Sequence, residues 1–144
     1  MMKPVNKAEI SFPSNSVNEG FARAAVSAFL AQLDPTVADL TDLKTAVSEA
    51  VTNSIVHGYR DAIGTVYISV KLFENGKTVV RVRDKGCGIP DIEQAMEPLY
   101  TTGGEERAGL GFAVMQSFCD SVRVTSSVGK ETSVTLTKYF ETKR

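Results

Sequence analysis

Alternating apolar and polar residues predict five strands. In the clearest one, Val66, Ile68, Val70 and Leu72 alternate with more polar neighbours, which is the pattern of a strand with one buried face. Asn75-Gly76 follows and is the preferred signal for a two-residue hairpin turn. The expected strands are 7–12, 65–73, 78–83, 121–126 and 132–139. The first stops at Pro13 and is typical of a sheet edge, and the last two are joined by a turn through Gly129.

Apolar residues at three- and four-residue steps predict three main helices. Ser16 and Glu19 match a capping box for the first helix. Asp34-Pro35 should end that helix and begin the second, with Asp34 as N-cap and Pro35 at the first helical position. The second should run to about Gly58, and a short helix is expected over 91–96. The predicted inward stripes are Phe21, Ala25, Ala28, Phe29 and Leu33, then Leu40, Leu43, Val47, Ala50, Val51 and Ser54, then Phe112, Val114, Met115 and Phe118.

The second helix also carries candidate chemistry. Glu49 and Asn53 are one turn apart, so a carboxylate and an amide project from the same flank, roughly opposite the apolar stripe. Judged from this helix alone, an ordinary solvated flank is the more frequent explanation for such a pair.

Two glycine-containing segments follow the central hairpin. After Asp84, Gly86 and Gly88 would let the backbone pass close to a ligand, although a plain turn explains them equally simply. Residues 97–108 are polar and without periodicity, which predicts a mobile loop. Gly109 and Gly111 then open a helix whose free N–H groups favour phosphate, but helix packing explains a Gly-x-Gly about as often.

Composition and charge narrow the class of protein. A chain of 144 residues with 42% hydrophobic content is expected to form one domain, 1–144. The net charge of -1, without runs of either sign, argues against nucleic acid as the main ligand and favours a protein or small-molecule partner. No signal peptide or long apolar stretch is present, so we expect no membrane association and a cytoplasmic protein.

The order of these weak signals resembles the GHKL family of ATP-binding domains, which share the Bergerat fold. Within it, the chain is most similar to the anti-sigma factor serine kinases of spore-forming bacteria. The similar segments are 33–36, 47–53, 57–59, 88–93 and 98–102, so the resemblance covers nearly the whole chain. It implies an α/β (α+β) two-layer sandwich, with helices packed on one face of a mixed, mostly antiparallel sheet, and a homodimer.

The resemblance also implies roles for individual residues. Asn53 would coordinate Mg2+ bridging the phosphates of ATP, and Glu49 would act as general base for the attacking hydroxyl. Asp84 would accept a hydrogen bond from the adenine amine. The other residues implied are Gly86, Gly88 and Thr132 around the base, Thr101 and Thr102 in the lid, Arg107 near the phosphates, and the backbone of Gly109, Leu110, Gly111 and Phe112 holding them.

One further residue concerns a protein partner. Arg23 lies off the predicted stripe of the first helix and would face solvent on composition alone, but it matches an arginine by which these proteins grip their sigma factor. The chain departs from the family pattern at Glu131, where a glycine is common, and at Gly103-Gly104 in the lid.

The implied function has two sides: holding a sporulation sigma factor inactive, and phosphorylating a serine on the anti-anti-sigma factor that releases it. A kinase of the same group acting on a general-stress sigma factor is one alternative. A nucleotide-gated sigma-binding module without turnover is another, which Glu49 disfavours because such a module has no use for a base. A third alternative, the ATPase piece of a larger machine, is disfavoured on the expectation that the chain is complete at 144 residues.

Overall fold

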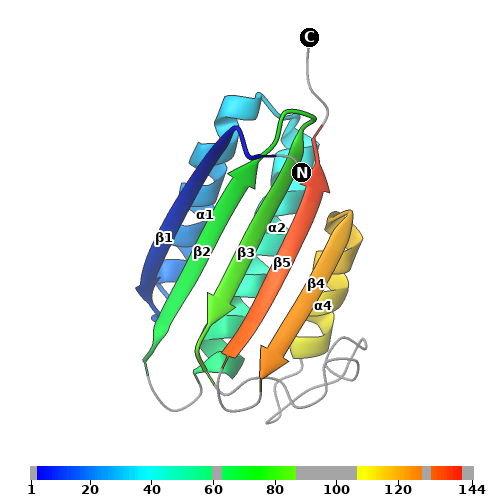
Figure 1. The fold of residues 1–144 in the computed structure, drawn as a ribbon. Coiled ribbons are helices and arrows are strands. Elements are labelled where there is room, and N and C mark those ends of the chain that lie inside the picture. The colour runs from blue at the N-terminus through cyan, green and yellow to red at the C-terminus, as the bar shows by residue number, and fades with distance from the viewer. Residues whose placement is uncertain (1–2, 60–62, 87–106, 128–130, 141–144) are drawn as a thin grey trace.

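Five strands form one sheet, as the alternating segments predict. The computed structural model describes residues 3–59, 63–86, 107–127 and 131–140. The strands are β1 (Asn6–Pro13), β2 (Thr65–Leu72), β3 (Lys77–Asp84), β4 (Ser121–Ser127) and β5 (Glu131–Tyr139). They are ordered β1-β2-β3-β5-β4 and all four pairings are antiparallel, where a mixed, mostly antiparallel sheet was expected (Figure 1). β1 lies at an edge, as predicted.

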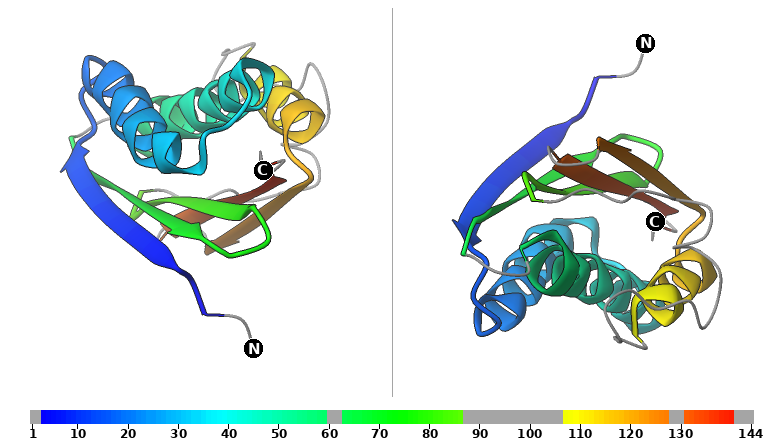
Figure 2. Two further views of the ribbon diagram at one scale, coloured as in Figure 1. Left: turned by 90° about the horizontal axis from the view of Figure 1, so that it is seen from above. Right: turned by 90° about the horizontal axis from the view of Figure 1, so that it is seen from below.

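The helices form a second layer on one face of this sheet. They are α1 (Asn18–Leu30), a short 3-10 turn η1 (Ala31–Leu33), α2 (Val37–Asn53), a π-helical turn η2 (Ser54–Gly58) that continues α2, and α4 (Arg107–Phe118). Figure 2 shows α1 and α4 on opposite sides of α2, and none of the described helices lies on the other face of the sheet. The two-layer α/β sandwich is therefore confirmed. No helix within these described ranges is long and apolar enough to span a membrane.

The core lies between the two layers. Strand register places one apolar row across the whole sheet, formed by Ile10, Ile68, Val82, Val134 and Val124. The helix layer contributes buried residues that include Leu30, Leu43, Val47, Val51 and Met115. Each such side chain removed from water stabilises the fold by about 1.5–3 kcal/mol. A strand that turned its apolar residues outward would lose this energy at several positions at once, so the alternation predicted the inner faces correctly.

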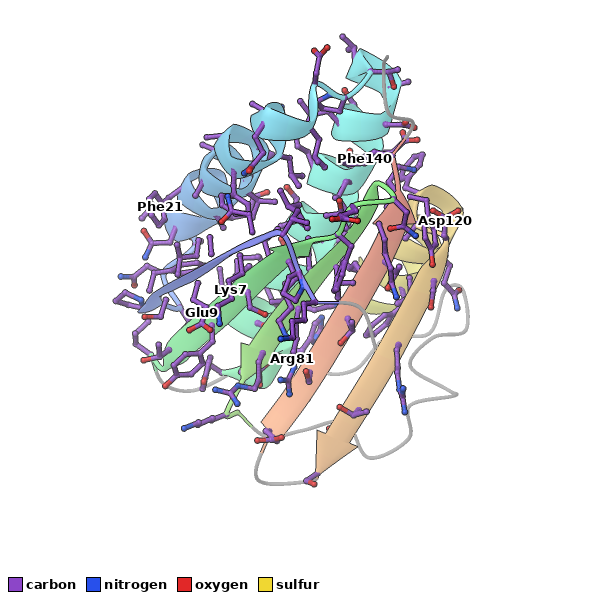
Figure 3. The ribbon with its side chains drawn as sticks, turned by 45° about the horizontal axis from the view of Figure 1, so that its top comes forward. Lys7, Glu9, Phe21, Arg81, Asp120 and Phe140 are labelled. Carbon is purple, nitrogen blue, oxygen red and sulfur yellow. The ribbon has the colours of Figure 1, made fainter. Side chains whose placement is uncertain are left out.

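The other face of the sheet is polar. Figure 3 shows Lys7, Glu9 and Arg81 on the side turned away from the helices. Register pairs Glu9 with Ser69 and Ser69 with Arg81, and the Arg81 guanidinium donates a hydrogen bond to Ser133 Oγ (2.6 Å). Tyr67 lies in the next row of this face, with the Arg83 guanidinium 4.9 Å from its ring centroid.

The central hairpin is confirmed, but its predicted two-residue turn is wrong. The Phe73 N–H donates to Lys77 O (2.9 Å) and the Gly76 N–H donates to Phe73 O (3.2 Å), so three residues separate the bonded pair. Gly76 alone in this turn has a positive φ, at 81°. A two-residue type I′ turn would need positive φ at both central positions, which Asn75 does not adopt.

The predicted helix caps are also wrong. No side chain caps α1, and Glu19 instead forms an ion pair with Arg23 (3.2 Å), so the Ser16 capping box is absent. The N-cap of α2 is Thr36, whose Oγ1 accepts a hydrogen bond from the Asp39 N–H (3.1 Å). Asp34 has a φ of 48° and ends η1. Thr36 prevails because its hydroxyl caps α2 while Asp39 puts an acidic side chain in the first turn.

The predicted inward stripe of the first helix is correct only in part. Phe29 and Leu33 pack against the core, but the fully buried residues of α1 lie one position further along. Ala22, Val26 and Leu30 are buried, whereas Phe21 is 52% exposed and Ala28 is exposed. Both sets of residues have helical spacing, so periodicity alone did not select between them. The Phe21 ring instead packs edge-on against Phe12 from β1, with ring centroids 6.0 Å apart.

Candidate functional site

The predicted polar residues gather at one edge of the sandwich. The C-terminal end of α2, the end of β3 and the starts of β5 and α4 all lie at the lower edge in Figure 1. These elements carry Glu49 and Asn53, Asp84, Thr132 and Gly111 respectively. Antiparallel pairing of β3 with β5 brings Asp84 opposite Thr132, although they are far apart in the sequence.

Glu49 and Asn53 face the beginning of α4 rather than open solvent. A Cβ atom placed on Gly111 would lie 3.1 Å from Glu49 Oε2, 3.7 Å from Asn53 Nδ2 and 3.9 Å from Asn53 Oδ1. The absence of a side chain at Gly111 therefore lets α4 approach both polar groups closely. This packing contradicts an ordinary solvated flank on α2.

Asn53 is half-buried, and the nitrogen of its amide is buried and, among the described residues, unpaired. Its Nδ2 has no hydrogen-bond partner within the described ranges, and such a buried donor costs about 1–3 kcal/mol. Ser48 Oγ and Thr78 Oγ1 share this condition, so an unpaired atom alone does not mark a site. Asn53 differs from them because Glu49 and the start of a helix flank it. Of the two amide atoms, Oδ1 is the kind of ligand that Mg2+ prefers, since this ion commonly takes only one or two oxygens from protein when phosphates supply others. The unpaired Nδ2 can instead donate a hydrogen bond to an acceptor on a ligand.

Asp84 is held at the end of β3 by α2 and by its own turn. Its side chain is 2% exposed, accepts a hydrogen bond from the Gly86 N–H at Oδ1 (2.9 Å) and is also hydrogen-bonded by the Ser54 side chain. Burial raises the pKa of the Asp84 carboxyl, and the charge of Glu131 adds to the rise, while the two hydrogen bonds oppose it. A buried carboxylate of this kind is a strong acceptor for an N–H group of a ligand.

Two glycines allow this close packing. A Cβ atom on Gly58 would lie 2.8 Å from the Asp84 carboxyl carbon, and one on Gly86 would collide with the Gly58 carbonyl oxygen. Gly58 ends the π-helical turn η2, which brings the backbone after α2 against the turn after β3. Any larger side chain at either position would push these segments apart.

Thr132 lies beside Asp84 on the inner face of the sheet. It is 7% exposed, and its Oγ1 is 3.1 Å from Ser126 Oγ. Glu131 immediately precedes it at the start of β5. The proximity of Thr132 to Asp84 agrees with a shared role around one ligand group.

Sequence reasoning missed Tyr59 and gave Ser54 a packing role only. The Tyr59 hydroxyl donates to Thr65 O (2.7 Å) and accepts from the Lys85 N–H (2.7 Å). Burial raises the pKa of the Tyr59 phenol, the hydrogen bond from Lys85 lowers it, and the charge of Asp84 raises it again. The hydroxyl therefore stays protonated at neutral pH. Only its position next to Gly58 could have drawn attention to it.

The remaining predicted residues fall into three groups. Gly88, Thr101 and Thr102 lie outside the described residues. Arg107, Gly109 and Leu110 belong to the first turn of α4, and Phe112 follows them and is 3% exposed. Arg23 is exposed on α1, which α2 separates from α4 (Figure 2). The structure thus brings together Glu49, Asn53, Asp84, Thr132 and the start of α4, but not Arg23.

Comparisons with known proteins find similar sequences over nearly the whole chain. Residues 12–138 match the family model described as the histidine kinase-like ATPase domain. The anti-sigma F factor of Thermoanaerobacter sp. (strain X514) is 55% identical over 141 residues, covering 96% of this chain and 97% of the relative. That of Geobacillus kaustophilus (strain HTA426) is 54% identical over 137 residues, covering 94% and 93%.

Solved structures show the same fold in more distant proteins. The RsbU and RsbW domains of a Mycobacterium tuberculosis protein superpose with a TM-score of 0.71 at 22% identity, covering 95% of this chain. Full-length ShkA in complex with AMPPNP gives a TM-score of 0.62 at 20% identity, covering 99% of this chain. The chain spans about a third of each of these two proteins, at 32% of their length.

Proposed function

This chain belongs to the histidine kinase-like ATPase family, and on that premise we propose that it is an ATP-dependent anti-sigma factor and protein serine kinase. The observation that carries the proposal is the packing of Glu49 and Asn53 against Gly111 at the start of α4. A carboxylate, an amide and the N-terminal end of a helix together suit a nucleotide phosphate and the hydroxyl that attacks it.

We propose that the nucleotide lies with its base at Asp84 and its phosphates at α4. The buried Asp84 carboxylate would accept a hydrogen bond from the exocyclic amine of adenine, with Gly86, Gly88 and Thr132 around the base. The backbone of Gly109, Leu110, Gly111 and Phe112 would hold the phosphates, with Arg107 near them and Thr101 and Thr102 in a lid. The family match and the helix start at Arg107–Phe118 support this arrangement.

The proposed reaction moves the terminal phosphoryl group of ATP to a serine hydroxyl. Glu49 would accept the hydroxyl proton as the serine oxygen bonds to phosphorus and the bond to the ADP oxygen breaks. Asn53 would contribute a ligand to Mg2+, which would neutralise charge on the phosphates. The protein contributes mainly by positioning, because phosphoryl transfer needs little covalent chemistry from the enzyme.

We propose a sporulation sigma factor, sigma F, as the protein partner, and its anti-anti-sigma factor as the phosphorylated substrate. Relatives named anti-sigma F factors at 50–55% identity over nearly the whole chain support this choice over a general-stress sigma factor. Exposed Arg23 on α1 would contact the sigma factor. The protein would act in the cytoplasm as a homodimer of single domains spanning 1–144.

A direct experiment tests the kinase and the partner separately. The protein is mixed with labelled Mg-ATP and a candidate anti-anti-sigma factor, and serine phosphorylation is measured with and without sigma F. Label on a serine, together with ATP-dependent retention of sigma F, supports both parts. Retention without label would favour the nucleotide-gated module, and steady hydrolysis of ATP with no labelled acceptor would favour the ATPase of a larger machine.

A further inference from the structure

Tyr59 joins three segments that surround the proposed base site. Its hydroxyl donates to Thr65 O at the start of β2 and accepts from the Lys85 N–H just beyond β3, both at 2.7 Å. Its ring lies so close to Gly64 that a Cβ atom there would overlap it. Tyr59 follows directly on η2, so this one side chain ties the end of the α2–η2 helix to two strands of the sheet.

The same hydroxyl controls the turn that follows Asp84. Two consecutive backbone N–H groups follow the end of β3. The Lys85 N–H donates to the Tyr59 hydroxyl, and the Gly86 N–H donates to the Asp84 carboxylate at 2.9 Å. The Gly86 N–H lies on the next peptide unit, so Tyr59 holds the Asp84–Lys85 peptide unit that comes before it. If this unit rotated, the Gly86 N–H would move away from Asp84, and the carboxylate would lose one of its two described hydrogen bonds.

We propose that Tyr59 is a positioning residue that makes the site selective for a purine with an exocyclic amine at position 6. The inference rests on the proposed function, because it assumes that Asp84 faces the base. Adenine presents a donor at that position, whereas hypoxanthine presents a carbonyl acceptor that a fixed carboxylate repels. A carboxylate free to turn away discriminates less, so selectivity depends on the hydrogen bonds that hold Asp84 in place.

The chain offers a conservative variant and a matched control. Tyr59→Phe keeps the ring that packs on Gly64 and removes only the hydroxyl. Tyr139→Phe makes the same change at the opposite end of the sheet, where Tyr139 is 51% exposed and pairs with Lys77 at the start of β3. A general loss from removing a tyrosine hydroxyl would appear in both variants, whereas a positioning effect would appear in Tyr59→Phe alone.

The test compares dissociation constants for Mg-ATP and Mg-ITP, measured by calorimetry without any protein partner. We expect the wild type and Tyr139→Phe to prefer ATP by at least about a hundredfold, because a site built around a ligand donor strongly rejects an analogue that lacks it. In Tyr59→Phe this ratio should fall by about fivefold or more, the effect of one lost hydrogen bond. Hydrogen exchange of the Lys85 amide, measured without nucleotide, should accelerate by a similar factor.

Each result decides between separate ideas. An unchanged ATP-to-ITP ratio in Tyr59→Phe, with the ratio abolished in Asp84→Asn, would overturn the role of Tyr59 and leave the proposed function standing. Equal weakening of both nucleotides would reduce Tyr59 to a structural tie and would overturn the inference as well. A wild type without preference for ATP would instead contradict the placement of the base at Asp84, and the inference would fall with it.

Discussion

The contact between α4 and the Glu49–Asn53 pair leads to a quantitative prediction for Gly111→Ala. The new methyl group would lie 3.1 Å from Glu49 Oε2, a separation that few real Cβ contacts show, so the carboxylate must move by a few tenths of an ångström. The distances of 3.7 and 3.9 Å to the Asn53 amide atoms are ordinary van der Waals contacts. The substitution thus displaces the proposed general base while leaving Asn53 nearly in place.

Two opposing effects set the size of the change in stability. Replacing glycine by alanine inside a helix stabilises it by up to about 1 kcal/mol. Forcing Glu49 away from its preferred conformation costs about 0.5–1.5 kcal/mol, so the net free energy of unfolding should change little. Gly20→Ala in α1 is the reference, because nothing lies within 4 Å of its added Cβ and only the helical gain remains.

The effect on phosphoryl transfer should be larger than the effect on stability. A misplacement of about 1 Å in a catalytic group costs about a hundredfold in rate, so a shift of a few tenths should slow single-turnover transfer roughly tenfold. Affinity for ATP should fall less than the rate, because the backbone N–H groups of α4 remain. Urea unfolding and rapid-quench measurements check the two parts. If Gly111→Ala gained as much stability as Gly20→Ala and transferred phosphate at the wild-type rate, the close contact would have no part in the site.

Three further substitutions test the rest of the proposal. Glu49→Gln should slow single-turnover transfer by about 100- to 10,000-fold with ATP affinity nearly intact, and an unchanged rate would remove Glu49 from the mechanism. Asp84→Asn should weaken ATP binding at least about tenfold by calorimetry. It should also stabilise the nucleotide-free protein by about 1 kcal/mol at pH 7. Burial raises the pKa of the Asp84 carboxyl in the folded protein, so protonation of Asp84 stabilises the fold fully below about pH 3.8 and this contribution is lost as the pH rises. The stability advantage of the Asn variant should therefore grow from acid to neutral pH. A difference in stability that does not change with pH would contradict this. Arg23→Ala should weaken sigma-factor binding by about tenfold or more, whereas Glu19→Gln, which only releases its ion-pair partner Arg23, should not.

The features predicted correctly from the sequence are those that depend on local periodicity. The inner face of β2 could be assigned because its alternation leaves only one way to bury four apolar side chains. The pairing of Glu49 with Asn53 followed from helical spacing alone. The stripe of α1 was misassigned in part because Phe21 and Ala22 both fit helical spacing, and the fold buries Ala22 while Phe21 packs against Phe12 of β1. Asp34 and Thr36 are both residue types that cap helices and are only two positions apart, so the sequence did not show that Thr36 is the N-cap of α2.

The features that sequence reasoning missed are contacts between distant segments. Tyr59 and Lys85 are 26 residues apart, and their hydrogen bond exists only because η2 and β3 meet at one edge of the sandwich. Ser54 has the spacing of a core residue and is buried, but its side chain forms a hydrogen bond with the Asp84 carboxyl. A stripe of buried positions shows which residues face inward, but it does not show which polar partner each of them meets.

The proposed site therefore reflects polar burial that the fold alone does not compensate. At one edge of the sandwich, Asp84 keeps a carboxylate out of water with its pKa raised. The Asn53 amide nitrogen there has no hydrogen-bond partner among the residues that the structure describes. The buried carboxylate and the unpaired amide both destabilise the nucleotide-free protein, and apolar residues at positions 84 and 53 would remove this cost. A ligand that offers an amine to Asp84 and a metal-bound phosphate to Asn53 would satisfy both groups at once. Because these two demands correspond to opposite ends of one nucleotide, the same edge of the fold would select both the base and the phosphates under the proposed function.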